Sequence, residues 1–223
     1  MMLRDPVSSL SHLFTAAWAV LATGVMFRLV GGGWRRRVPV AIYGGSMVAL
    51  FLASGVYHAL MLPREQLRLF QKLDRTAIYL LIAGTNTPVM AFVLRGRFRT
   101  WMLCFLWGFA AVGIAYQWLL PKAPYAAVVG ICMGMGWAGL MPLRTYYRAL
   151  GWRAMNWVWA GTGLYTLGSV CELCEWPVIV PNWVSFHDFF HFCVTAGTVA
   201  FCGFIVRYVL HYTPPDPPIP RPT

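Results

Sequence analysis

Charged residues are scarce in this chain. Of its 223 residues, only 11% are Asp, Glu, Lys or Arg, whereas 59% are hydrophobic. Soluble domains carry about 25% charged residues, so the composition argues against a water-soluble globule, and it excludes a disordered or collagen-like chain. The hydrophobic residues form long blocks and do not alternate with polar ones, which disfavours an outer-membrane barrel. The sequence therefore predicts an all-α integral membrane protein built as a transmembrane helix bundle.

The apolar blocks and the breaks between them divide the chain into seven expected spans. A helix needs about 20 apolar residues to cross a bilayer, and glycines 31–33, Pro63, Pro121 and Pro142 each close a block. We expect one seven-transmembrane-helix domain over residues 1–212 and a disordered Pro-rich tail over residues 213–223. The expected spans are residues 10–30, 39–62, 73–94, 100–120, 124–140, 152–173 and 185–210.

Acidic residues are scarcer still, with 7 Asp and Glu against 18 Lys and Arg, which gives a net charge of +11. The basic residues cluster between the apolar blocks and form no single basic face, so we expect contact with anionic lipid headgroups and no nucleic-acid partner. The loops after the first, third and fifth spans, together with the tail, hold a two-to-one excess of Lys and Arg. This bias predicts a cytoplasmic C-terminus and an external N-terminus.

The chain also lacks a second Cys-x-x-Cys pair. Cys171 and Cys174 form one such pair, and a zinc ribbon requires two. The other four cysteines lie within apolar blocks and are interpreted as small core residues. A redox role for Cys171 and Cys174 stays open as the less favoured alternative.

Ionisable side chains are rare within the apolar spans, which makes each of them a candidate functional residue. His58 lies near the end of the second span, Asp74 near the start of the third, and His187 and His191 near the start of the seventh. Because consecutive spans run in opposite directions, these span ends share one membrane face. The sequence predicts that the four side chains converge there, on the non-cytoplasmic side.

The spacing of these residues favours a metal site. His187 and His191 are four residues apart, as are Ser54 and His58, so each pair faces one side of its helix. Three neutral imidazoles with an open fourth position form a catalytic type of zinc site, and Asp74 could hydrogen-bond a water there. His58, His187 and His191 are thus the predicted metal ligands. The alternative is that the histidines are separate interfacial or packing residues.

Other polar residues near the same face receive lesser roles. His12 is interpreted as a packing residue. The alternative is that it contacts the metal ligands and supports them without binding the metal itself. Glu172 and Glu175 are interpreted as a solvated helix end rather than as charges at the entrance to a site. Asp188 is expected to stabilise the start of its helix. His211 is expected at the opposite face.

Several blocks together resemble the hemolysin III family, the bacterial branch of the progestin and adipoQ receptors. The resemblance covers the chain from about His12 to the last span. The chain differs from the family pattern at residues 171–177 and at Asn86, where a Tyr is common. The matching blocks are Ser-x-x-x-His at 54–58, residues 73–88, Met-Gly-Trp at 135–137, residues 161–168, and His-Asp-Phe-Phe-His at 187–191.

The resemblance implies seven helices around a zinc ion in a bacterial inner membrane. It implies His58, His187 and His191 as ligands, Asp74 contacting the metal through water, and Ser54 beside them. It also places the chain in a wider group of membrane hydrolases that includes alkaline ceramidases.

The leading hypothesis is a zinc-dependent, ceramidase-like membrane hydrolase that acts on a lipid amide or ester. In it Asp74 is the general base, and Ser54 either orients Asp74 or binds the developing oxyanion. The alternative is a non-enzymatic receptor-like or pore-forming protein in which zinc only joins helices. Structural zinc usually has four protein ligands, so three histidines favour catalysis. The sequence leaves the oligomeric state and the lipid substrate open.

Overall fold

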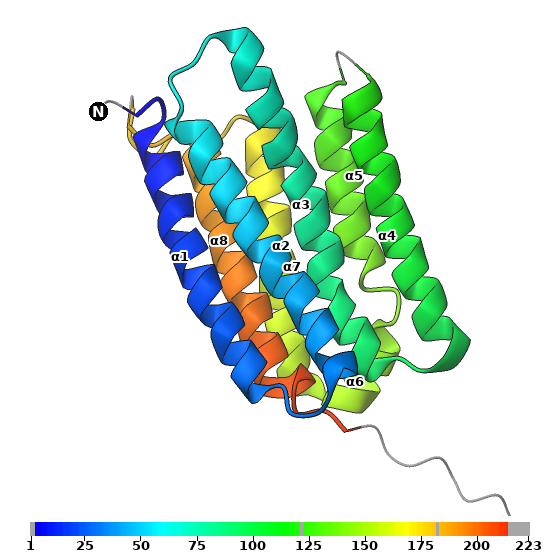
Figure 1. The fold of residues 1–223 in the computed structure, drawn as a ribbon. Helices are drawn as coiled ribbons and strands as arrows, with labels where there is room; N and C mark the ends of the chain where they lie inside the picture. Colours follow the sequence, from blue (N-terminus) through cyan, green and yellow to red (C-terminus); the bar gives the residue numbers. More distant parts are fainter. Residues whose placement is uncertain (1–2, 121–122, 182, 214–223) are drawn as a thin grey trace, which may run out of the picture.

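The computed structural model describes residues 3–120, 123–181 and 183–213, and these residues are almost entirely helical (Figure 1). This confirms the predicted all-α class. The helices are α1 (Pro6–Leu29), α2 (Trp34–Ala59), α3 (Arg64–Val93), α4 (Gly96–Leu119), α5 (Tyr125–Ala138), α6 (Leu143–Leu150), α7 (Trp152–Leu173) and α8 (Phe186–Phe204), and a π-helical turn η1 (Ile205–Val209) extends α8. The expected tail lies outside the described residues, apart from Thr213.

Five of these helices are long and apolar enough to cross a membrane, namely α1, α2, α3, α4 and α8 with η1. Helices α5 and α6 meet at a bend of 45°, and together they would form a sixth crossing. Helix α7 is 22 residues long but includes Arg153, Asn156 and Glu172, and it falls short of the hydropathy of the other five. The described structure therefore supports five or six crossings by length and hydropathy, where the sequence predicted seven.

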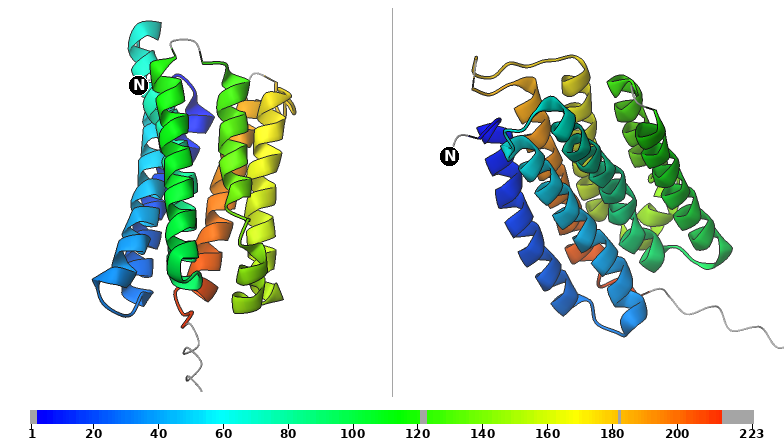
Figure 2. Two further views of the ribbon diagram at one scale, coloured as in Figure 1. Left: turned by 90° about the vertical axis from the view of Figure 1, so that its right-hand side faces the viewer. Right: turned by 45° about the horizontal axis from the view of Figure 1, so that its top comes forward.

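Two regions depart most from the expected organisation, the start of α3 and the segment that forms α6. Helix α3 begins at Arg64, nine residues before the expected start, because residues 64–72 are too polar to register as part of an apolar block. Its first turns project beyond the neighbouring helices (Figures 1 and 2). Helix α6 lies where a loop was expected: Pro142 directly precedes it, Tyr146 is buried, and Arg148 lies in its last turn.

The helices pack in chain order into a closed bundle. Each of α1 to α4 packs on the next helix, α5 packs on α7, α7 on α8, and α8 returns to α1 (Figure 2). The chain entering α1, the end of α2, the first half of α3, the end of α7 and the start of α8 therefore lie towards one end of the bundle. This end is called the site end below.

Close helix contacts fix this arrangement. A side chain at Gly44 in α2 would collide with Thr23 of α1, so the glycine sets the α1–α2 spacing. At the opposite end, the Arg36 guanidinium donates to the Leu210 carbonyl at 2.6 Å and lies 4.6 Å from the centre of the Phe92 ring. Arg36 thereby holds the C-terminal end of α8 against α2 and α3, because it satisfies a carbonyl that the helix leaves unpaired.

Candidate metal centre

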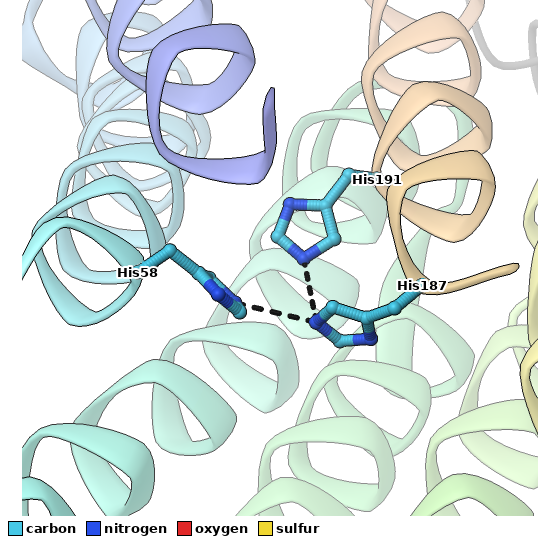
Figure 3. A group of neighbouring side chains, drawn as sticks. All are labelled: His58, His187 and His191. Carbon is cyan, nitrogen blue, oxygen red and sulfur yellow. Dashed lines mark hydrogen bonds between the residues drawn. The ribbon is translucent and has the colours of Figure 1, made fainter. Parts of the chain in front are cut away.

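Three imidazoles meet at the site end, from the last turn of α2 and the first two turns of α8 (Figure 3). The Nε2 atom of His187 lies 3.3 Å from Nε2 of His58 and 3.1 Å from Nε2 of His191. One ring nitrogen from each residue falls within 4.8 Å of the other two. The structure thus brings together the three histidines that were predicted to converge from the alternating direction of the spans and the four-residue spacing in the last one.

Two carboxylates set the orientation of two of these rings. Asp5 Oδ2 lies 2.9 Å from Nδ1 of His58, and Glu172 Oε1 lies 3.0 Å from Nδ1 of His187. We assign the proton to Nδ1 in both rings, since an ionised carboxylate can only accept. The Nε2 lone pairs then face the centre of the cluster. Metal-binding histidines almost always have such a partner on the other nitrogen.

Asp5 precedes the membrane-spanning part of α1 and also accepts from Nε of Arg4 at 3.0 Å. Burial alone would raise the pKa of the Asp5 carboxyl, but the hydrogen bonds from His58 and Arg4 outweigh this effect, so its pKa lies below the usual value. Asp5 therefore stays ionised at neutral pH and remains an acceptor for His58.

Sequence reasoning missed both carboxylates. Asp5 was assigned no role, although it directly precedes a helix that begins at the site end. Glu172 was interpreted as part of a solvated helix end, and this interpretation is wrong: it is only 7% exposed and also accepts from the Tyr125 hydroxyl at 2.9 Å. Glu175, in contrast, is exposed as expected. Periodicity could not identify Glu172, because its partners lie on α5 and α8.

His191 is supported from behind by a fourth histidine. The His12 ring stacks on the His191 ring with centroids 3.9 Å apart, and His12 is only 2% exposed. His12 thus packs behind the cluster and holds His191 in place. The start of α8 is fixed by Asp188, which forms a capping box with Ser185 and accepts from the Ser8 hydroxyl at 2.6 Å. The expected helix-start role of Asp188 is therefore confirmed.

Ser54 and Asp74 lie in the same cavity wall as the histidines. The Ser54 hydroxyl, one turn before His58, lies beside the Asp74 carboxylate, and this carboxylate also interacts electrostatically with His187. Ser54 is only 2% exposed, so its hydroxyl is shielded from solvent. The structure therefore brings all five predicted site residues to one cavity.

A cavity of about 540 Å³ runs from this cluster into the bundle. Asp74 lines its polar end, whereas Asn86, Tyr146 and Phe204 line its far end. Twelve residues of α3 separate Asp74 from Asn86, a distance of about 18 Å at the helical rise of 1.5 Å per residue. The walls between are mostly aliphatic and aromatic side chains. Such a cavity fits an amphiphile with its polar group beside the histidines.

The donor set fits a divalent metal ion. Lone pairs on two Nε2 atoms 3.1 Å apart repel each other unless a cation or a proton lies between them. With Nδ1 of His58 and His187 committed to carboxylates, both rings offer neutral nitrogen to the centre. Three nitrogen donors with room for a further ligand suit zinc well. His58, His187 and His191 could therefore hold a metal ion.

Comparison with known proteins gives consistent matches over most of the chain. A family model described as Haemolysin-III related matches residues 1–202. The chain is 31% identical to Hemolysin-3 of Bacillus cereus over 78% of this chain and 76% of the relative. It is 28% identical to the Hemolysin-3 homolog of Bacillus subtilis (strain 168), over 74% and 75% of the two chains. It is 30% identical to the human Monocyte to macrophage differentiation factor, over 72% and 67%.

Proposed function

Because the chain belongs to the Haemolysin-III related family of integral membrane proteins, we propose that its histidine cluster is the zinc centre of a membrane hydrolase acting on a lipid amide or ester. The observation that carries this proposal is the position of the cluster. His58, His187 and His191 lie beside Asp74 and the buried Ser54, at the polar end of a deep apolar cavity. A site that only joined helices would need neither the pair nor the cavity.

Zinc bound by these three imidazoles would supply a Lewis acid and lower the pKa of water to about 7. Asp5 and Glu172 hold two of the imidazoles with their Nε2 lone pairs towards the centre. A structural zinc usually takes four protein ligands, and the described residues group only three around this point. The open position favours a catalytic role.

Asp74 acts as the general base in the proposed reaction. Its carboxylate takes a proton from the attacking water and passes it to the leaving nitrogen or oxygen of the substrate, so that a carboxylic acid and an amine or alcohol are formed. Ser54 was predicted either to orient Asp74 or to bind the oxyanion. The position of Ser54 beside Asp74 supports the orienting role, because its hydroxyl can donate a hydrogen bond to that carboxylate.

The cavity supplies the part of the site that binds the lipid. An acyl chain extending from the cluster towards Asn86 would lie among apolar side chains and leave the scissile carbonyl at the histidines. Burial of the chain would also exclude bulk water from the reacting group. A ceramide-like lipid amide is therefore the first substrate class to test.

The Asp74→Asn variant distinguishes a hydrolase from a protein in which zinc only joins helices. This variant should keep most of its zinc, because the three imidazoles remain, and should lose hydrolysis by about 10²–10⁴-fold, the usual contribution of a positioned base. His58→Ala should lose both zinc and activity. Glu65→Gln, which neutralises an exposed carboxylate on the same helix, is the matched control and should change neither.

The assay follows product release from short-chain ceramides and related lipid amides and esters, with zinc measured in the same preparations. Turnover by Asp74→Asn at the wild-type rate would remove Asp74 from the mechanism. A wild-type protein that binds zinc but hydrolyses none of the lipids would favour the alternative in which the metal only joins helices.

A further inference from the structure

A row of basic side chains on α3 leads to the mouth of the cavity. Arg64, Arg68, Lys72 and Arg75 are spaced by four, four and three residues, so they share one face of the helix. Arg64 and Arg68 are exposed on the projecting turns of α3 (Figure 1). The Lys72 ammonium donates to the Trp118 carbonyl at 3.3 Å. Arg75, the innermost of the four, lines the cavity itself.

Arg75 differs from the other arginine at the mouth in what it contacts. Arg4 forms an ion pair with Asp5 at 3.0 Å and lies over the Tyr57 ring at 4.4 Å. The guanidinium of Arg75 lies over the Tyr125 ring, 4.9 Å from its centre. Among the described residues, no carboxylate lies within ion-pair distance of Arg75. Its charge is held in place by an aromatic ring and interacts with the Asp74 carboxylate only beyond ion-pair distance.

The acidic groups at the mouth already have other partners. Asp5 accepts from Arg4 and His58, and Asp74 interacts with Ser54 and His187. Glu172 accepts from His187 and from the Tyr125 hydroxyl. Tyr125 therefore connects Arg75 to the histidine cluster: Arg75 lies over its ring, and its hydroxyl binds Glu172, the carboxylate that also binds His187. A ligand whose scissile carbonyl reaches the cluster would place its headgroup close to Arg75.

We propose that Arg75 binds an anionic group on the lipid headgroup, so that the preferred substrate of the proposed hydrolysis carries a phosphate or carboxylate and is not a neutral ceramide. A guanidinium presents paired N–H donors that match either anion. Arg64 and Arg68 on the exposed turns attract the same lipids from the membrane surface. The site then recognises three parts of one molecule: an anion at the mouth, a carbonyl at the histidines and a chain in the bundle. This assignment rests on the proposed function.

The binding test uses a pair of lipids that no hydrolase of amides or esters can cleave. One is a 1-O-alkylglycerol 3-phosphate and the other the 1-O-alkylglycerol with the same fluorescent tail, each titrated into detergent-purified full-length protein. The wild type should bind the phosphate ether at least ~10-fold tighter, as expected for hydrogen bonds to a charged group. Arg75→Gln should weaken that binding by about 10- to 100-fold and change the binding of the neutral ether by less than about 2-fold.

Arg99→Gln is the matched control, because it removes the same charge from an exposed position near the start of α4, at the opposite end of the bundle. It should bind both ethers as the wild type does. Equal affinity of the wild type for the two ethers would overturn the proposal. So would an equal loss in Arg75→Gln and Arg99→Gln, which would reflect net charge alone.

Competition with inorganic phosphate tests whether the site at Arg75 binds a lipid headgroup or a free anion. At millimolar concentration it should displace the phosphate ether from the wild type and leave the neutral ether bound. If inorganic phosphate binds as tightly as the phosphate ether, the site takes a free anion and the lipid assignment is wrong.

The two proposals fail in different ways. If the wild type discriminates between the ethers through Arg75 but hydrolyses no lipid, the headgroup site stands and the hydrolase proposal falls. If it hydrolyses lipids but Arg75→Gln binds both ethers like the wild type, the hydrolase proposal stands and the headgroup site falls.

Discussion

Glu172→Gln tests whether the carboxylate behind His187 contributes to metal binding. Glu172 is 7% exposed, and its Oε1 lies 3.0 Å from Nδ1 of His187 and 2.9 Å from the Tyr125 hydroxyl. Gln is nearly the same size, so the substitution removes the charge and leaves the packing. The imidazole then loses a charged acceptor, which lowers the basicity of its Nε2 and loosens the orientation of the ring.

Loss of such a partner typically lowers metal affinity by about 10- to 100-fold, which corresponds to ~1.4–2.7 kcal/mol. The measurement is the zinc dissociation constant of detergent-purified protein, determined by competition with a chromogenic chelator. Glu175→Gln, an identical change at an exposed position three residues later, should match the wild type. Zinc affinity of Glu172→Gln within about twofold of the wild type would refute the inference that Glu172 supports the ligand.

The remaining predictions concern packing and orientation. Gly44→Leu should destabilise the protein by about 1–3 kcal/mol, because its side chain would meet Thr23 of α1, whereas Gly45→Leu, with open space around it, should melt like the wild type in detergent. An unchanged melting temperature for Gly44→Leu would contradict the close α1–α2 contact. The Lys and Arg bias predicts that, in a cysteine-free background, a cysteine at Gln66 reacts with an impermeant external thiol reagent and one at Thr213 does not; the reverse pattern would place the histidine cluster on the cytoplasmic side.

The sequence predicted the parts of this structure that follow from local periodicity and chain direction. Long apolar blocks gave the helices, and a four-residue spacing placed His187 and His191 on one face of α8. The alternation of span direction was sufficient to bring His58 to the same end, without any knowledge of which helices pack together. These inferences needed no contact between distant residues.

The features that the sequence did not reveal depend on tertiary contacts or on polar helices. Asp5 and Glu172 reach their histidines across 53 and 15 residues, and neither spacing belongs to a helical repeat. The first turns of α3 and the whole of α6 are polar enough to be mistaken for loops, although both are helical. The number of crossings stays at five or six by length and hydropathy, because α5 and α6 are bent relative to each other and α7 carries polar residues.

Zinc content tests the central claim most directly. The wild-type protein, purified in detergent without added metal and analysed by inductively coupled plasma mass spectrometry, should hold about one zinc ion per chain, since a single cluster of three imidazoles converges in the described residues. The His187→Ala/His191→Ala double variant should hold almost none. His211→Ala, which removes an exposed histidine at the opposite end of the bundle, should retain the wild-type amount. Equal, substoichiometric zinc in the wild type and the double variant would contradict the assignment of this cluster as a metal centre.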